Sequence, residues 1–131
     1  MKALDTNVLI RYLVQDDPRQ GRKAAAYIEG AAAADEQILI SNIVLCETVW
    51  VLESAYGYVK PEIQAALEKL LQSSTFQFET KDIVWAAFEE YCAVKADFAD
   101  CLMGRLHRAL GCEPTATFDT ALRKLSTFQM L

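Results

Sequence analysis

Residues 1–14 read MKALDTNVLIRYLV, and this stretch contains the turn on which the predicted fold depends. Residues 2–4 form a short apolar run that ends at Asp5, and the apolar side chains of residues 6–14 recur at helical spacing. The pattern predicts a strand that turns sharply into a helix at Asp5. Open α/β sheets bind ligands outside the carboxyl ends of their strands, so Asp5 is the first candidate site residue.

Strands and helices alternate along the rest of the chain. Apolar spacing predicts helices over residues 19–34, 42–56, 61–71, 81–96 and 97–110, the second of them capped by Ser41 or Asn42. Strands are predicted over residues 37–41, 76–79 and 114–118, a short helix opens at Asp119, and residues 126–131 form a tail. This alternation predicts an α/β fold with a mostly parallel central sheet and helices on both faces.

The length of 131 residues suits one domain, and we expect a single domain over residues 1–131. With 53% hydrophobic and 24% charged residues, the chain has the composition that a packed core needs. It shows no signal-peptide pattern, and no window approaches about 20 apolar residues. We therefore expect no membrane partner and a cytoplasmic location, with reduced thiols.

The balance of charged residues limits the ways in which this chain can bind a nucleic acid. It has 13 basic and 18 acidic residues, a net charge of −5. Holding nucleic acid through a general electrostatic field needs clustered Lys and Arg, so any nucleic-acid chemistry here must be local. The four cysteines form no Cys-x-x-Cys pair and His107 is the single histidine, which excludes a structural zinc site. We expect the cysteines to be small buried hydrophobes.

Asp5 and Asp119 occupy equivalent places in the predicted fold. Asp119 follows the last predicted strand as Asp5 follows the first, so both side chains are expected to project toward the crevice at the strand ends. Asp is also favoured as the cap of a helix, near the positive end of its dipole. Taken singly, each of the two residues fits capping better than chemistry.

Glu47 lies in the apolar stretch IVLCETVWVL, residues 43–52, which offers no basic side chain. A carboxylate is costly there unless something pairs with it, which favours a functional role. Helical spacing equally allows a narrow solvent-exposed stripe that Glu47 shares with Ser54.

Asp97 and Asp100 are three residues apart at a predicted helix start and therefore share a face. The structural alternative is a cap followed by an acid in the first turn. If several of these carboxylates converge, each pair about 4 Å apart repels by about 4 kcal/mol at an effective dielectric near 20. A divalent cation or raised pKa values would relieve this repulsion. Ligands that are all oxygen suit Mg²⁺ or Mn²⁺, which activate water for phosphodiester hydrolysis.

Four acidic motifs occur in order along the chain: LDTNVLIRY over residues 4–12, CETVWVLE over 46–53, ADCLM over 99–103 and TFD over 117–119. With these motifs the whole chain resembles the PIN-domain ribonucleases, specifically the VapC-type toxins of toxin–antitoxin pairs. The resemblance implies a PIN-like α/β/α sandwich and metal-dependent endoribonuclease activity on RNA. It also implies a homodimer and inhibition by a cognate antitoxin whose basic tail enters the acidic groove.

The resemblance also assigns roles to residues. The implied acids are Asp5, Glu47, Asp100 and Asp119, with Asp97 as a further metal ligand, and the supporting polar residues are Thr6, Asn7, Ser41 and Thr117. The third motif departs from the Asp-Ala-Leu-Ile-Ala that is common in the family, because residues 100–104 read Asp-Cys-Leu-Met-Gly. The acid is kept, so the departure concerns local packing.

Two groups of basic residues are candidate phosphate contacts. Arg105 and Arg108 share a helical face. Positive charges near a helix C-terminus, however, more often stabilise the helix by interacting with the negative end of its dipole. Arg19, Arg22 and Lys23 lie at the start of another helix, where the dipole disfavours cations. That position hints at a phosphate role, against the alternative of a solvated face.

Other side chains have structural interpretations. Arg11 can pair with Asp16 or Asp17, although solvent is its default partner. Aromatic residues at helical spacing are expected in the core or partly at a dimer interface: Trp50, Tyr56, Trp85, Phe88 and Tyr91.

Other functions compete with the nuclease. A non-catalytic module of PIN fold would use the acidic groove only to dock a basic protein partner. A phosphoacceptor receiver domain needs an acidic pair after the first strand, but Thr6 and Asn7 follow Asp5. A haloacid-dehalogenase-type phosphatase needs an Asp at the position of Asn7. The opening motif disfavours both of these enzymes.

Overall fold

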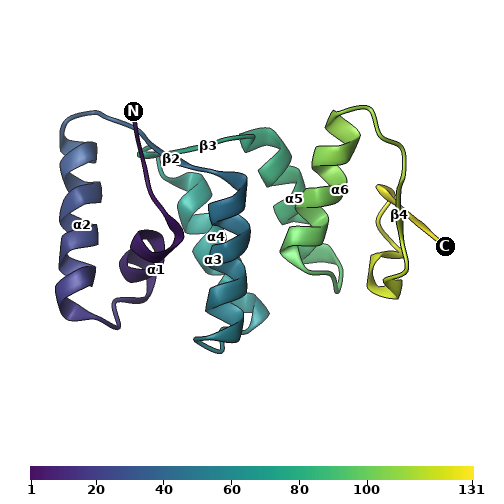
Figure 1. Cartoon of the computed structure of the whole chain (residues 1–131), viewed down its shortest axis with the longest axis horizontal. Coiled ribbons are helices and arrows are strands. Elements are labelled where there is room, and N and C mark those ends of the chain that lie inside the picture. The colour runs from purple at the N-terminus through teal and green to yellow at the C-terminus, as the bar shows by residue number, and fades with distance from the viewer. The chain divides into compact units, whose positions relative to one another are not determined.

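The computed structural model describes all 131 residues and divides into two compact units, Met1–Glu79 and Thr80–Leu131. The colours of Figure 1 follow the chain from purple in unit 1 to yellow at the end of unit 2. No helix in either unit combines the length and the apolar character needed to cross a membrane.

Unit 1 contains a three-stranded parallel sheet in the order β1-β2-β3. Its strands are β1 (Lys2–Ala3), β2 (Ile38–Ile40) and β3 (Phe76–Phe78). Its helices are α1 (Thr6–Val14), α2 (Pro18–Ala33), α3 (Asn42–Ser54) and α4 (Lys60–Gln72). Since all strands are parallel, their carboxyl ends meet at one edge, where α1 and α3 begin.

The burial pattern of unit 1 explains why these segments form these elements. Ile38 and Ile40 of β2 are fully buried, as expected for a central parallel strand, and Phe76 and Phe78 of β3 are buried on either side of an exposed Gln77. The helices bury their apolar faces around this sheet, with the core residues Leu9, Ile10, Ile28, Leu45, Leu52, Ile63, Leu67 and Leu70. The predicted strand-to-helix turn at Asp5 is confirmed.

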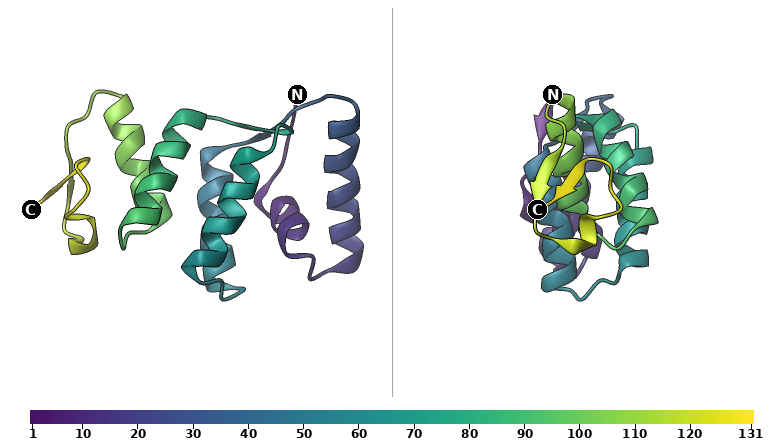
Figure 2. Two further views of the ribbon diagram at one scale, coloured as in Figure 1. Left: turned by 180° about the vertical axis from the view of Figure 1, so that it is seen from behind. Right: turned by 90° about the vertical axis from the view of Figure 1, so that its right-hand side faces the viewer.

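Unit 2 contains two packed helices and a small parallel sheet. The helices α5 (Lys81–Ala93) and α6 (Phe98–Ala109) lie side by side (Figure 2). The rings of Tyr91 and Phe98 meet edge to face, with 5.9 Å between their centroids. Strands β4 (Thr115–Thr117) and β5 (Phe128–Met130) pair in parallel, joined by the short 3₁₀ helix η1 (Thr120–Leu122).

Two predictions about unit 2 are wrong, one at the end of the chain and one at the end of α5. Residues 126–131 were expected to form a tail, but Phe128–Met130 is a strand that pairs with Thr115–Thr117. This pairing joins segments that are separated in the sequence, and three residues are too few to show the alternation of apolar and polar side chains that predicts a strand. The helix predicted over residues 81–96 ends at Ala93, because Val94 has extended backbone angles.

Burial corrects two expectations about single side chains. Trp50 is 68% exposed on α3, so its assignment to the core is wrong and a dimer interface remains a prediction. Cys101 is buried as expected, whereas Cys92 and Cys112 are exposed and Cys46 is half-buried.

Gly104 explains the departure in the third acidic motif. A Cβ atom at this position of α6 would lie 2.6 Å from Thr127 Oγ1 and 2.7 Å from Phe128 Cε2. Real carbon atoms do not approach so closely, so only glycine lets α6 and the segment around β5 pack at this distance. The glycine is therefore coupled to the strand that the sequence did not reveal.

Substituting Gly104 by Ala is expected to destabilise the protein by about 1–3 kcal/mol, because overpacking forces neighbouring atoms to move. The measurement is urea unfolding followed by circular dichroism. Gly30→Ala in α2 is the matched control, since a Cβ at Gly30 would meet nothing within 4 Å. Ala in a helix interior is favoured over Gly by about 1 kcal/mol, so this control should be stabilised. A Gly104→Ala variant as stable as the parent would contradict the packing argument.

Candidate functional site

In unit 1, Asp5 and Glu47 are linked through Thr6. Asp5 directly follows β1, and its Oδ1 caps α1 by accepting a hydrogen bond from the N–H of Val8 at 3.0 Å. The hydroxyl of Thr6 donates to Oε1 of Glu47 at 3.3 Å, which places the Glu47 carboxylate beside the turn between β1 and α1. Glu47 is exposed, as the solvent-stripe interpretation expected. Capping occupies one oxygen of Asp5, and the other oxygen has no protein partner.

Two further polar residues at this edge of unit 1 serve as helix caps. The Oγ of Ser41 accepts from the N–H of Val44 at 3.3 Å and so caps α3. Glu79 follows β3 and accepts from the N–H of Asn42 at 3.0 Å. The sequence reasoning missed Glu79 because the strand was predicted to run through residue 79, whereas β3 ends at Phe78 and leaves Glu79 directly after it, as Asp5 comes just after β1.

In unit 2, three carboxylates interact around the first turn of α6. Burial raises the pKa of Asp100, and the negative charges of Asp97 and Asp119 raise it further. Asp97 is the cap residue of α6 but makes no capping hydrogen bond with its side chain. Asp97, Asp100 and Asp119 therefore interact electrostatically, whereas the convergence of all the predicted acids stays a prediction.

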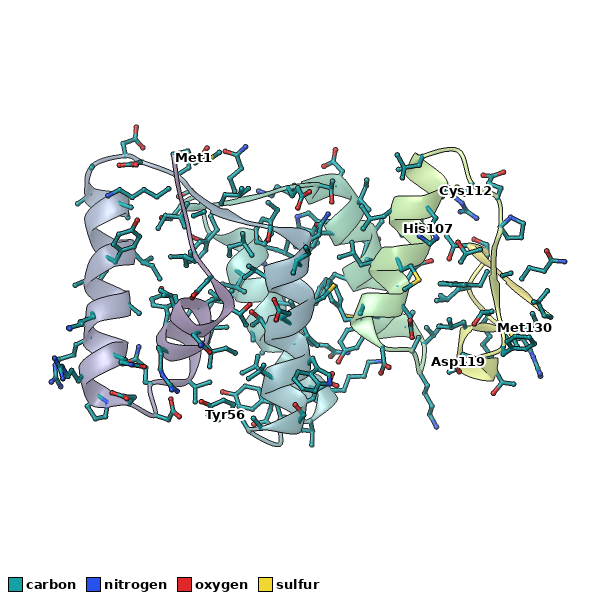
Figure 3. The ribbon with its side chains drawn as sticks, viewed as in Figure 1. Met1, Tyr56, His107, Cys112, Asp119 and Met130 are labelled. Atoms are coloured by element: carbon teal, nitrogen blue, oxygen red, sulfur yellow. The ribbon has the colours of Figure 1, made fainter.

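Asp119, labelled in Figure 3, lies just after β4 and is held by Thr117 at the end of that strand. The N–H of Asp119 donates to Thr117 Oγ1 at 3.0 Å, and Asp119 Oδ1 accepts from the N–H of Ala121 at 2.9 Å. The second contact caps η1, which matches the structural interpretation of this acid. Thr117 supports the backbone that presents Asp119.

The acids of both units lack positive partners. No lysine or arginine forms an ion pair with any member of the set Asp5, Glu47, Asp97, Asp100 and Asp119. Neither unit by itself gathers three His, Cys, Asp or Glu side chains closely enough to hold a metal ion. The donor set consists of carboxylate oxygens, which is the chemistry that Mg²⁺ and Mn²⁺ favour.

Arg105 and Arg108 have partners inside unit 2. Arg105 donates to Glu90 Oε2 at 3.0 Å, and Arg108 donates to the backbone oxygen of Ser126 at 2.9 Å. Arg108 also forms an ion pair with Glu113 at 3.6 Å. These contacts favour a structural role for both arginines, and their contact with RNA phosphate stays a prediction.

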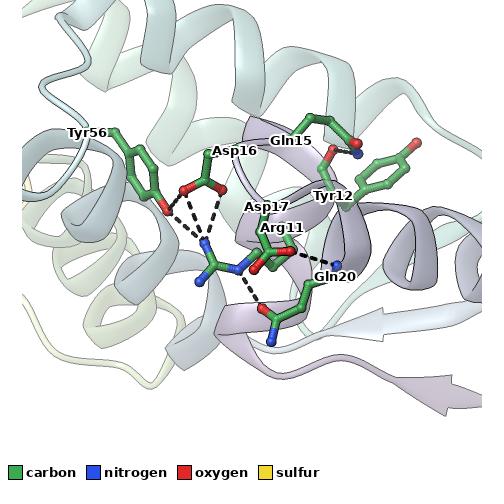
Figure 4. Close-up of polar contacts among 7 residues, drawn as sticks. All are labelled: Arg11, Tyr12, Gln15, Asp16, Asp17, Gln20 and Tyr56. Carbon is green, nitrogen blue, oxygen red and sulfur yellow. Dashed lines mark hydrogen bonds and ion pairs between the residues drawn. The ribbon is translucent and has the colours of Figure 1, made fainter.

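Arg11 lies at the centre of a polar cluster, made of Arg11, Asp16, Gln20 and Tyr56 (Figure 4). Its guanidinium group contacts Asp16 Oδ1 and the Tyr56 hydroxyl oxygen, each at 3.0 Å, and donates to Gln20 Oε1 at 2.7 Å. The Tyr56 hydroxyl donates to Asp16 at 2.8 Å. Arg11 pairs with Asp16, one of its two possible acidic partners, so the default expectation of solvent is wrong, and the role of Tyr56 was missed.

This polar cluster ties the start of α2 to α1 and to the end of α3. The hydrogen bond from Tyr56 lowers the pKa of Asp16, and the charge of Arg11 lowers it further. A carboxyl group with a lowered folded-state pKa stabilises the fold above its unfolded pKa, and this contribution is lost as the pH falls through the folded-state value.

Tyr56→Phe is therefore expected to lower the unfolding midpoint at neutral pH, by less than Gly104→Ala does, because the cluster is solvent-exposed. The difference from the parent should shrink at acidic pH, where Asp16 is protonated in both proteins. Thermal unfolding across a pH series measures this. Tyr58→Phe is the control, since no hydrogen bond of the Tyr58 hydroxyl is present. Equal losses in the two variants at every pH would contradict the assigned role.

Comparison with known proteins connects this geometry to a family. The family model of the PIN domain matches residues 2–127, which include all five acids. A VapC ribonuclease from Aquifex aeolicus (strain VF5) is 26% identical over 125 residues, which cover 95% of this chain and 92% of that protein. No solved structure matches the chain significantly.

Proposed function

Because the chain belongs to the PIN-domain family, we propose that it is a VapC-like endoribonuclease, a toxin that hydrolyses phosphodiester bonds of RNA. The observation that carries this proposal is the group of acids without positive partners. In unit 2, burial raises the pKa of Asp100, and the negative charges of Asp97 and Asp119 raise it further. A protein gains no stability from such repulsion, so a bound cation is the simplest reason for its presence.

The ion we propose is Mg²⁺ or Mn²⁺, held by Asp5, Asp97, Asp100 and Asp119, with Glu47 as a further catalytic acid. When bound, it supplies an activated water and neutralises charge on the phosphate. The chain's own residues prepare this site. Thr6 orients the Glu47 carboxylate, Asn7 lies beside Asp5, Ser41 fixes the start of α3, and Thr117 fixes the backbone of Asp119.

The proposal includes the domain and its partners. The family model spans both units, which supports one PIN domain over residues 1–131. The relative named VapC ribonuclease supports RNA as substrate and a cognate antitoxin as inhibitor. A net charge of −5 suits an antitoxin with a basic tail. The exposed Ile43 and Trp50 on α3 suit a homodimer, and we place the protein in the cytoplasm.

The test is incubation of the purified chain with transfer RNA and Mg²⁺, followed by analysis of the product ends. Hydrolysis by water with loss of the 3′ oxygen leaves a 5′-phosphate and a 3′-hydroxyl. A 2′,3′-cyclic phosphate would contradict the proposed chemistry, because it forms by attack of the ribose hydroxyl. Tight binding of a basic partner with no cleavage under Mg²⁺ or Mn²⁺ would instead favour the non-catalytic binding module.

A further inference from the structure

A pocket of about 570 Å³ lies in unit 1 among β1, α1 and α2. Its volume falls within the usual range of small-ligand sites, roughly 300–1,000 Å³. The polar residues that line it are Asp5, Asn7, Arg11, Gln20, Lys23 and Tyr27. The pocket therefore joins the proposed catalytic carboxylate of Asp5 to a wall that contains two cations and an aromatic ring.

The two cations of this wall differ in how far their charge is neutralised. Arg11 is held by Asp16 in the polar cluster of Figure 4. Lys23 forms no ion pair, and neither do Arg19 and Arg22 in the preceding turn of α2. Asp17 caps α2 by accepting a hydrogen bond from the N–H of Gln20 at 3.0 Å, but the first turn after it contains no acidic residue. Three cations therefore follow one carboxylate at the positive end of this 16-residue helix, and this local excess of positive charge favours an anion on an otherwise acidic chain.

Tyr27 lies one helical turn after Lys23 on the same face of α2. Its side chain lines the pocket and remains 43% exposed. The ammonium group of Lys2 lies over its ring, 5.0 Å from the ring centre. Lys2 also pairs with Glu36 at 3.8 Å, so Lys23 is the cation beside this ring that forms no ion pair. An exposed ring next to such a cation suits single-stranded nucleic acid, since bases stack on aromatic rings and cations hold the phosphates. The aromatic ring therefore favours a nucleotide over an anion that has no base to stack.

We propose that this pocket binds a nucleotide of single-stranded RNA beside the bond that is cleaved, and this rests on the proposed function. Lys23 binds the phosphate of that nucleotide, and Tyr27 stacks on its base. A basic peptide is the poorer occupant, because Lys23, Arg19 and Arg22, which form no ion pair, would repel it. The pocket therefore selects for an unpaired segment of RNA rather than for a duplex, whose bases are not free to stack.

The test measures binding of a short fluorescein-labelled single-stranded RNA of mixed sequence by fluorescence anisotropy, over a series of salt concentrations with Mg²⁺. An Asp100→Asn background keeps the RNA intact. We expect Lys23→Gln to weaken binding roughly tenfold and to reduce the slope of log K against log salt by about 0.7, the effect of one lost phosphate contact. We expect Tyr27→Leu to weaken binding about tenfold and Tyr27→Phe to restore it, because Phe keeps the stacking surface.

Lys124→Gln is the matched control. Lys124 is exposed, forms no ion pair and does not line the pocket, so its substitution should leave the salt slope unchanged. With Asp100 intact, Lys23→Gln should raise KM for RNA and change kcat little, since it removes binding rather than chemistry.

The outcomes separate this inference from the proposed function. If Lys23→Gln and Tyr27→Leu bind RNA as the parent does, the inference is overturned, even when the parent cleaves RNA. Loss of antitoxin binding with unchanged RNA binding overturns it as well and assigns the pocket to a protein. If RNA binding depends on Lys23 and Tyr27 but the parent cleaves no RNA, the inference that the pocket binds RNA is supported and the nuclease proposal fails.

Discussion

Asp100→Asn is expected to reduce RNA cleavage by at least about a hundredfold. Asn keeps the size of the side chain but removes the negative charge that helps to hold the ion, and such an ion contributes several kcal/mol to the transition state. The measurement is kcat/KM for RNA with Mg²⁺. Asp35→Asn is the matched control, because it removes one carboxylate at a position with φ of 54°, a conformation that Asn accepts readily.

The same substitution is expected to stabilise the metal-free protein at neutral pH. The pKa of Asp100 is raised in the fold by burial and by Asp97 and Asp119, so its carboxylate is less favourable in the folded chain than in the unfolded chain. The stability of the parent therefore falls as the pH rises through the range between the unfolded and folded pKa values. Asn does not titrate, so its advantage should vanish at acidic pH. A variant that loses both stability and activity would indicate a structural role for Asp100.

Removal of divalent ions is the second change with a large expected effect. We expect EDTA to abolish RNA cleavage and either Mg²⁺ or Mn²⁺ to restore it, because the proposed chemistry relies on the ion to activate the attacking water. Cleavage that persists in EDTA would contradict the proposal.

The ion should also raise the unfolding midpoint, since a ligand that binds only the folded state stabilises it by RT ln(1 + [L]/Kd). Differential scanning fluorimetry measures this with increasing Mn²⁺. The shift should be small in Asp5→Asn and Asp100→Asn, and of parental size in Asp35→Asn. Equal shifts in all of these proteins would place the ion elsewhere.

The sequence predicted those parts of the fold that depend on local signals. The turn at Asp5, the cap at Ser41 and the helix start at Asp97 are visible because capping residues and apolar spacing lie within a few residues of each other. Contacts between distant segments were not predictable. The hydrogen bond between Tyr56 and Asp16 joins residues 40 positions apart, and the pairing of β5 with β4 rests on segments of three residues.

In the candidate site, too, residues with local signals were predictable and contacts made by packing were not. The acids were found because carboxylates in apolar helices and after strands are conspicuous in a sequence. The bond from Thr6 to Glu47, the raised pKa of Asp100 and the pocket beside Lys23 depend on burial and packing. The small residue at Gly104 was noticed only as a departure, and its reason required the position of Thr127.

A crystal soaked in Mn²⁺ and measured near the manganese absorption edge tests the central claim most directly. We predict an anomalous peak within coordination distance, about 2.0–2.3 Å, of carboxylate oxygens from both Asp5 and Asp100. A crystal with no peak at these residues, or with their carboxylates bound to arginine or lysine side chains, would contradict the account.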